Sequence, residues 1–128
     1  MSNAKFLNLG DLEMATLEHI WRVREGDAKS VHAELGVARG ITHNTIQSTL
    51  DRLYKKQILR RRKVSHAFIY TASFSRTDFL SQAIGAVVNM VRGDSGEVLT
   101  AFVDFAARTD QQTLAALERT LAERTARR

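Results

Sequence analysis

Residues 42–56, THNTIQSTLDRLYKK, are the stretch that the rest of the chain is built to present. Thr42 is a good N-cap, and the apolar residues that follow recur at the spacing of a single helical stripe, at Ile46, Leu50 and Leu53. The opposite face and its flanks are polar, with Asn44, Thr45, Gln47, Ser48, Asp51, Arg52 and Lys55. Amides, hydroxyls and guanidinium groups bind base edges and phosphates in the DNA major groove. The stretch therefore predicts a recognition helix; an ordinary amphipathic surface helix is the alternative.

Two helical segments are expected before it. The first covers about residues 11–24 and buries Leu12, Leu17, Ile20 and Trp21. Trp21 continues this apolar stripe, so we expect a core anchor rather than a platform for base stacking. Glu25-Gly26 ends the helix, and Asp27 caps a second, short helix that runs to about Gly36. Two short helices joined by a turn indicate a helix-turn-helix, although such pairs occur in many folds.

The periodicity changes after Lys56. Residues 57–63 and 67–71 are β-prone runs separated by Val64-Ser65-His66, which predicts a hairpin. Its first strand carries four consecutive cations, from Arg60 to Lys63, and its tip carries His66. Behind a helix-turn-helix such a hairpin is a wing that places cations along the phosphate backbone. The alternative is a solvated edge strand whose charges prevent aggregation.

The remainder, from residue 75, is expected to form three helices. Ser75 with Asp78, Asp94 with Glu97, and Thr109 with Gln112 resemble capping boxes. The apolar residues of these helices offer more surface than about 54 residues can bury alone. We therefore expect pairing with a second chain, through Leu80, Ile84, Val87, Val91, Leu99, Phe102, Phe105, Leu114, Leu117 and Leu121. The alternative is a monomer in which the helices fold back on the first part.

Composition limits the class of protein. The 128 residues are 44% hydrophobic and 26% charged, and no apolar run is long enough to insert in a membrane. No secretory signal is evident, so a soluble cytoplasmic protein is expected. Residues 1–74 hold 12 Lys and Arg against 7 Asp and Glu, whereas residues 75–128 hold 7 of each. A basic module joined to a neutral one suggests polyanion binding beside an interaction region.

The sequence offers little support for an enzyme. The absence of cysteine excludes thiolate metal sites and cysteine nucleophiles. His19, His32, His43 and His66 show no ligand spacing with carboxylates, and no glycine-rich phosphate loop follows a strand. No cofactor or metal is therefore expected. The rival to a DNA-binding protein is a protein-interaction adaptor on a winged-helix scaffold; RNA binding is less favoured because the aromatic residues are placed for cores.

Four segments together resemble the penicillinase-repressor (BlaI/MecI/CopY) family of bacterial transcription regulators, over about residues 7–125. They are Leu9-Gly10-Asp11-Leu12-Glu13, Ile20-Trp21, the block 45–56, and the basic hairpin ending in Phe68-Ile69-Tyr70. The resemblance implies a mainly α fold, with a winged helix-turn-helix domain at 7–74 and a helical dimerisation domain at 75–128. It also implies a homodimer that binds a palindromic double-stranded DNA operator and blocks transcription.

The resemblance assigns DNA contacts to the helix and the wing, at Thr42, His43, Asn44, Thr45, Gln47, Ser48, Arg52, Arg60, Arg61, Arg62, Lys63 and His66. Asp51 also faces outward, but phosphate repels a carboxylate. Asp51 either accepts a hydrogen bond from cytosine or, as we favour, orients a neighbouring cation.

Regulation in the family suggests one further site. β-Lactam-responsive members are cut between Asn and Phe by a membrane sensor protease, and the matching pair here is Asp104-Phe105. The alternative role of Phe105 is interface packing. Thiolate copper sensing, which other members use, is excluded by the absence of cysteine.

Overall fold

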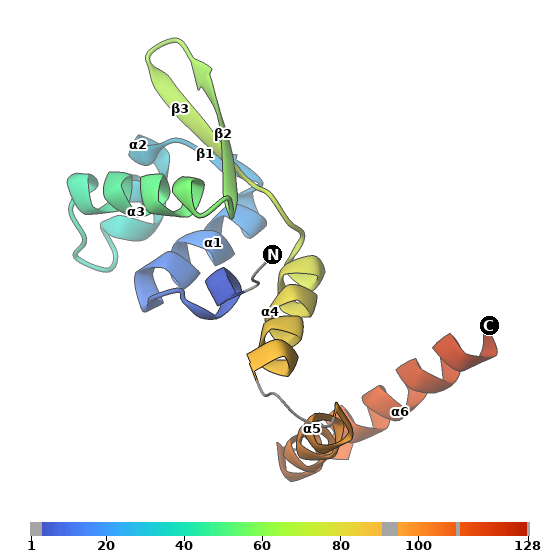
Figure 1. Ribbon diagram of the computed structural model, residues 1–128. Helices are drawn as coiled ribbons and strands as arrows, with labels where there is room; N and C mark the ends of the chain where they lie inside the picture. The colour runs from blue at the N-terminus through green and yellow to red at the C-terminus, as the bar shows by residue number, and fades with distance from the viewer. Residues whose placement is uncertain (1–3, 91–94, 110, 128) are drawn as a thin grey trace. The chain divides into compact units, whose positions relative to one another are not determined.

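The computed structural model describes residues 4–90, 95–109 and 111–127, which divide into two compact units, Met1–Val87 and Val88–Arg128 (Figure 1). The first unit contains, in order, η1 (Ala4–Leu7), α1 (Asp11–Val23), β1 (Glu25–Gly26), α2 (Ala28–Val31), η2 (His32–Gly36), α3 (His43–Lys55), β2 (Leu59–Val64), β3 (Ala67–Ala72) and most of α4 (Arg76–Met90). The second contains α5 (Ser95–Thr109) and α6 (Gln111–Ala126). The predicted fold class, mainly α with a β wing, is confirmed.

Helices α2 and α3 form the predicted helix-turn-helix. Asp27 accepts a hydrogen bond from the Ser30 N–H at 2.7 Å, and Thr42 accepts one from the Thr45 N–H at 3.2 Å, so both expected caps are present. After α2 the chain widens into the π-type turn η2. Gly36 ends this turn, where a Cβ atom would lie 3.1 Å from Cγ1 of Ile46. The missing side chain therefore lets α3 pack closely against the turn.

The wing belongs to a three-stranded antiparallel sheet in the order β1-β3-β2. The predicted hairpin is confirmed, with Arg61 opposite Tyr70 and Lys63 opposite Phe68. It begins later than expected, because Gln57 adopts a positive φ of 65° and continues the turn after α3. The sequence also gave no sign of β1, whose two residues pair with β3 through Glu25 opposite Thr71.

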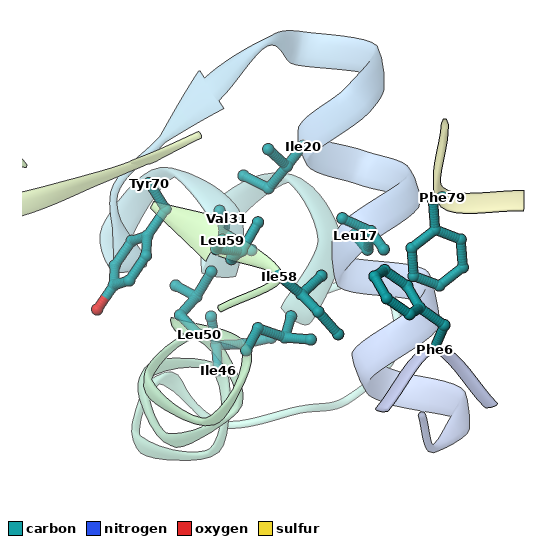
Figure 2. Close-up of a cluster of buried hydrophobic side chains, with 11 residues drawn as sticks. Phe6, Leu17, Ile20, Val31, Ile46, Leu50, Ile58, Leu59, Tyr70 and Phe79 are labelled. Carbon is teal, nitrogen blue, oxygen red and sulfur yellow. The ribbon is translucent and has the colours of Figure 1, made fainter. Parts of the chain in front are cut away.

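The apolar stripe of α3 holds the helix against the core. Ile46, Leu50 and Leu53 are completely buried and share one cluster with Leu17 and Ile20 of α1. Figure 2 shows this cluster between the helices and the sheet. Burying each such side chain stabilises the fold by about 1.5 to 3 kcal/mol. Because the inner stripe is fixed in this way, the polar face of α3 stays outside.

Aromatic residues complete the core at its other end. Phe6 of η1 packs edge-on against Phe74 and Phe79, with ring centroids 5.2 and 5.3 Å apart. Trp21 lies against the same cluster and donates a hydrogen bond to the Phe74 carbonyl at 2.8 Å, as expected for a core anchor. The role of Phe6 was missed. Phe79 is buried in this core, so the first turns of α4 belong to the first unit. The sequence suggested a domain boundary earlier, between residues 74 and 75.

The helices after the wing follow the prediction in number, with differences at their ends. The hydroxyl of Ser75 accepts the Asp78 N–H at 3.0 Å, so the first capping residue is correct. Asp94 lies outside the described residues. Thr109 does not open α6; it is the last residue of α5, and its hydroxyl donates to the Phe105 carbonyl at 2.8 Å. Threonine can make this bond within its own helix, which competes with capping the next one.

None of the helices in the described parts of the chain combines the length and apolar character needed to cross a bilayer.

A salt bridge connects the end of α3 to α1. Lys56 Nζ lies 2.8 Å from Glu13 Oε2 and donates a second bond to the Asn8 carbonyl at 3.0 Å. Partial burial by itself raises the pKa of Glu13, but hydrogen bonds from Lys56 and the Gly10 N–H, with the positive charge of Lys56, outweigh it and leave the pKa below its ordinary value.

We expect Glu13→Gln to lower the free energy of unfolding at pH 7 by about 1 to 3 kcal/mol, because a charge-assisted bond is lost. Since folding depresses the pKa of Glu13 below the unfolded value of about 4.3, its contribution is present above that pH and is lost as the pH falls through the folded pKa. Between pH 7 and pH 3 the free energy of unfolding should therefore fall less for Glu13→Gln than for the unmodified protein. Urea unfolding at pH 7 and pH 3 measures both effects. Glu123→Gln, at an exposed site on α6, is the control and should change neither.

Candidate nucleic-acid interface

A cleft separates the outer face of α3 from the hairpin. Asn44, Gln47 and Ser48 line its helical side, and Phe68 and Tyr70 of β3 line the side of the wing. The three polar side chains are exposed, in keeping with the positions expected for them, opposite the buried stripe for Asn44 and Ser48 and on its flank for Gln47. Amide and hydroxyl groups are thus presented beside a two-stranded ribbon, the arrangement in which a winged helix reads a major groove.

Arg61 lies at the base of this cleft and joins its two sides. The guanidinium carbon is 3.8 Å from the centroid of the Tyr54 ring and 4.0 Å from that of Phe68, so the group lies between an aromatic ring of α3 and one of β3. Its Nη1 also donates to Asp51 Oδ1 at 3.2 Å. We call this group of four residues, Asp51, Tyr54, Arg61 and Phe68, the Arg61 clamp. Stacking and ion pairing together hold the hairpin at a fixed position beside α3.

The charges of the Arg61 clamp compensate one another. Hydrogen bonding to Lys55, at 3.0 Å, and to Arg61 keeps the pKa of the Asp51 carboxyl below its usual value. Desolvation by itself lowers the pKa of Arg61, but Tyr70 and Asp51 outweigh it and raise the pKa. Both groups therefore remain charged at neutral pH. As expected, Asp51 orients neighbouring cations, and its negative charge is balanced before any phosphate approaches.

The basic run of β2 divides between two faces of the sheet. Paired residues of neighbouring antiparallel strands share a face, so Arg61 and Lys63 lie with Tyr70 and Phe68, towards α3. Arg60 and Arg62 point to the other face, where Arg62 Nη2 donates to Glu25 Oε2 of β1 at 2.9 Å. Arg60 and Lys63 are exposed. The four cations expected to act alike thus have different surroundings.

The other residues expected to contact DNA surround α3 and the tip of the hairpin. Thr42 is occupied as the N-cap, and Thr45 accepts a hydrogen bond from its hydroxyl at 3.0 Å. His43 is exposed, and its ring lies edge-on to that of His32, with the two ring centroids 5.8 Å apart. On the flank away from the hairpin, Arg52 donates to Thr49 Oγ1 at 3.2 Å. His66 is exposed in the turn that Ser65 begins with a positive φ of 57°.

Sequence reasoning missed the aromatic partners of Arg61. Tyr54 follows Asp51 at a spacing of three residues on α3, so both belong to one side of the helix. Phe68 and Tyr70 alternate along β3 and therefore share a face. These spacings were visible in the sequence, but only the strand register shows which cation they receive.

Many side chains expected at a dimer interface are exposed in the structure. They are Leu80, Ile84 and Val87 on α4, and Leu99, Phe102, Phe105 and Leu121 on α5 and α6. Leu114 and Leu117 are half-buried in α6, which packs against α5. Val91 lies outside the described residues. The pair Asp104 and Phe105 is exposed on regular helix α5.

Within residues 4–90, 95–109 and 111–127, no three His, Cys, Asp or Glu side chains gather as a metal site would require.

Comparison with known sequences identifies one family. The family model for penicillinase repressors matches residues 9–123. The transcriptional regulator BlaI of Mycobacterium tuberculosis is 32% identical over 123 residues, covering 94% of this chain and 87% of the relative. The penicillinase repressor of Staphylococcus aureus is 22% identical over 102 residues, covering 80% of this chain and 79% of the relative.

Solved structures agree with the fold. The solution structure of the DNA-binding domain of the repressor BlaI matches with a TM-score of 0.51 and 30% identity, covering 56% of this chain and 87% of that domain. A chain from the hsRosR-S4 complex matches with a TM-score of 0.52, covering 84% of this chain and 98% of that one. At 16% identity this likeness bears on the fold alone.

The Arg61 clamp leads to a prediction about the free protein. Arg61→Ala removes one of the contacts between the hairpin and α3, so the backbone amides of β2 and β3 should exchange hydrogen several times faster while those of α1 stay protected. Hydrogen exchange followed by mass spectrometry measures this effect. Arg60→Ala removes the same charge from the neighbouring residue of the strand and should leave the exchange pattern unchanged. Equal exchange in the two variants would contradict the role given to Arg61.

Proposed function

The chain belongs to the penicillinase repressor family, and we propose that it represses transcription as a homodimer bound to a palindromic DNA operator in the cytoplasm. The observation that carries this proposal is the exposed polar face of α3, held beside a basic hairpin by the Arg61 clamp. Bound DNA would exclude RNA polymerase from the promoter by steric overlap, so the repressor needs no chemical step.

Base reading is assigned to the middle of α3. Asn44 and Gln47 have amides that can bind adenine through two hydrogen bonds, and Ser48 can donate or accept. Phosphate contacts are assigned to the exposed cations Arg60 and Lys63, with His66 at the tip of the wing. Contacts from Thr42, His43, Thr45, Arg52 and Arg62 remain part of the proposal. Arg61 acts by positioning the hairpin.

The dimer is proposed from exposed apolar surface. Leu99, Phe102 and Phe105 of α5 are each more than two-fifths exposed, at 64, 45 and 61%. Monomeric proteins rarely leave clustered large apolar side chains in water, and a second copy of the same helix would cover them. Two recognition helices about 34 Å apart would then enter successive major grooves on one side of the duplex.

Release follows from separating the protomers, because a single DNA-binding unit loses the effective concentration that the second half-site provides. Cleavage between Asp104 and Phe105 by a membrane sensor protease is one proposed signal. The pair lies within regular helix α5, so this segment has to unwind locally before a protease can bind it in an extended form.

Replacing a base-reading residue tests the recognition role. Once an operator has been selected from a random DNA pool, Gln47→Ala should weaken binding to it by about 1 to 3 kcal/mol and relax preference at one position in each half-site. Fluorescence anisotropy with single-base variants of the operator measures both effects. Gln82→Ala, the same change at an exposed site on α4, is the control. Equal weakening on every DNA sequence would show that Gln47 contacts only the backbone.

A charge in the exposed apolar surface tests the dimer. Phe102→Glu in the full chain should give a monomer in sedimentation equilibrium and lower the operator affinity, because a carboxylate cannot be buried unpaired. Thr100→Glu adds the same charge to α5 about 160° around the helix, at 100° per residue. This variant should remain a dimer. A Phe102→Glu protein that still dimerises and binds the operator normally would refute this interface.

A further inference from the structure

A second hollow, of about 720 Å³, lies in the first unit and is separate from the cleft between α3 and the hairpin. Helix α1 contributes Ala15, His19 and Arg22, the turn after η2 contributes Arg39, and the beginning of α4 contributes Arg76. Its size falls within the range of about 300 to 1,000 Å³ that small-molecule sites occupy. None of the roles assigned above to DNA binding or dimerisation uses these residues.

The hollow is strongly basic. Arg22, Arg24, Arg39 and Arg76 line it, and Glu18 is the one carboxylate among the lining residues. Glu18 already accepts a hydrogen bond from Arg76. Among the described residues, no carboxylate is paired with Arg22, Arg24 or Arg39. Several guanidinium groups around one space repel one another, and an anion placed between them removes that repulsion.

The walls beneath these cations are partly apolar and well supported. Trp21 and Leu35, both half-buried, line the space together with Ala15. The Trp21 indole is fixed by its hydrogen bond to Phe74 and by edge-on packing against Phe79 at 5.4 Å. The Arg76 guanidinium carbon lies 5.6 Å from the centroid of the Trp21 ring, so an occupant with an apolar body buries it here beside Arg76 and against Leu35. A simple inorganic anion would leave this apolar surface wet.

His19 forms a buried polar part of the same wall. It is 3% exposed, and Arg22 Nη2 lies 3.0 Å from its Nδ1. Its Nε2 lies 3.0 Å from Glu34 Oε2 without making an aligned hydrogen bond. The Arg22 guanidinium is thus held over the hollow from α1 rather than being free to extend into solvent.

The position of the hollow argues against DNA as the occupant. Ala15, Glu18 and Arg22 recur at helical spacing on the side of α1 opposite Leu17 and Ile20, which pack in the core with α3. A duplex lying on the outer face of α3 is therefore separated from these side chains by the core itself.

We propose that this hollow binds a small organic carboxylate with an apolar body, and that the ligand regulates DNA binding. Its carboxylate lies between Arg22 and Arg39, and its apolar part lies against Trp21 and Leu35. Arg39 precedes the cap of α3 by three residues, and Leu35 belongs to the turn against which Ile46 packs through Gly36. A ligand that draws Arg39 towards α1 changes the position of the N-terminal end of α3.

The binding claim stands on the hollow alone, whereas the regulatory claim rests on the proposed DNA-binding function. The two require separate measurements. Isothermal titration calorimetry of the full chain without DNA tests binding, with benzoate as the probe and benzamide as its neutral isostere. Operator titration with and without benzoate tests regulation.

Benzoate should bind saturably and at least about tenfold more tightly than benzamide, since a charge-assisted bond is lost with the amide. Arg22→Ala and Arg39→Ala should each weaken benzoate binding by about tenfold. Arg22→Ala also removes the contact with the buried His19 and could disturb the fold. Arg39 is exposed, so Arg39→Ala tests the site without that complication. Lys29→Ala, which removes an exposed charge from α2 outside the hollow, should bind benzoate normally.

Absence of saturable benzoate binding, equal binding of benzamide, or full binding by Arg39→Ala would each overturn the site. An operator affinity that saturating benzoate leaves unchanged would overturn the regulatory role. A chain that binds benzoate but no DNA would refute the proposed function and leave the site standing, so the two failures are distinguishable.

Discussion

The guanidinium group of Arg61, held between Tyr54 and Phe68 and paired with Asp51, is the interaction on which the DNA-binding surface depends. It joins a helix and a hairpin that have separate backbone hydrogen bonds, and it adds to the buried packing of Leu59 and Tyr70 with the apolar stripe of α3. The Arg61 side chain is 22% exposed, so aromatic rings cover most of a group that usually lies in water. Without this contact only the core packing would hold the hairpin beside α3, so the spacing between the polar face of α3 and the wing would vary more.

The opposite face of α3 supplies the second constraint. Ile46, Leu50 and Leu53 fix the helix to α1, and Lys56 ties its end to Glu13. A buried stripe, a lateral clamp and a terminal salt bridge therefore determine the position of the helix from three sides. The remaining side is polar and exposed, and it is the side free to contact a duplex. The acidic residue on that side, Asp51, has its charge balanced by Lys55 and Arg61.

Local patterns in the sequence predicted the elements, whereas their side-chain partners depended on distant pairing. The cap at Thr42, the stripe of α3 and the hairpin are all set by residues a few positions apart, and they were found. The direction of Arg61 depends on its register opposite Tyr70 and on the approach of α3, neither of which spacing alone determines. A run of four cations was therefore expected to act as one group.

Sequence patterns also failed to predict features that are very short or lie near the beginning of the chain. Strand β1 has two residues and is defined only by its partner β3. Phe6 lies in a single turn near the beginning of the chain, with no periodicity to mark it as core. The hollow beside α1 combines side chains from three segments, and each arginine alone resembles an ordinary surface residue.

The salt dependence of operator binding tests most directly whether Arg61 positions the wing or contacts phosphate. Affinity falls as salt concentration rises, and each phosphate contact adds about one to the magnitude of the negative slope of log affinity against log salt concentration. If Arg61 positions the wing, Arg60→Ala should reduce the magnitude of this slope by about one, whereas Arg61→Ala should weaken binding with little change in slope. An equal reduction of the slope in both variants would show that Arg61 contacts the DNA backbone and would contradict its positioning role.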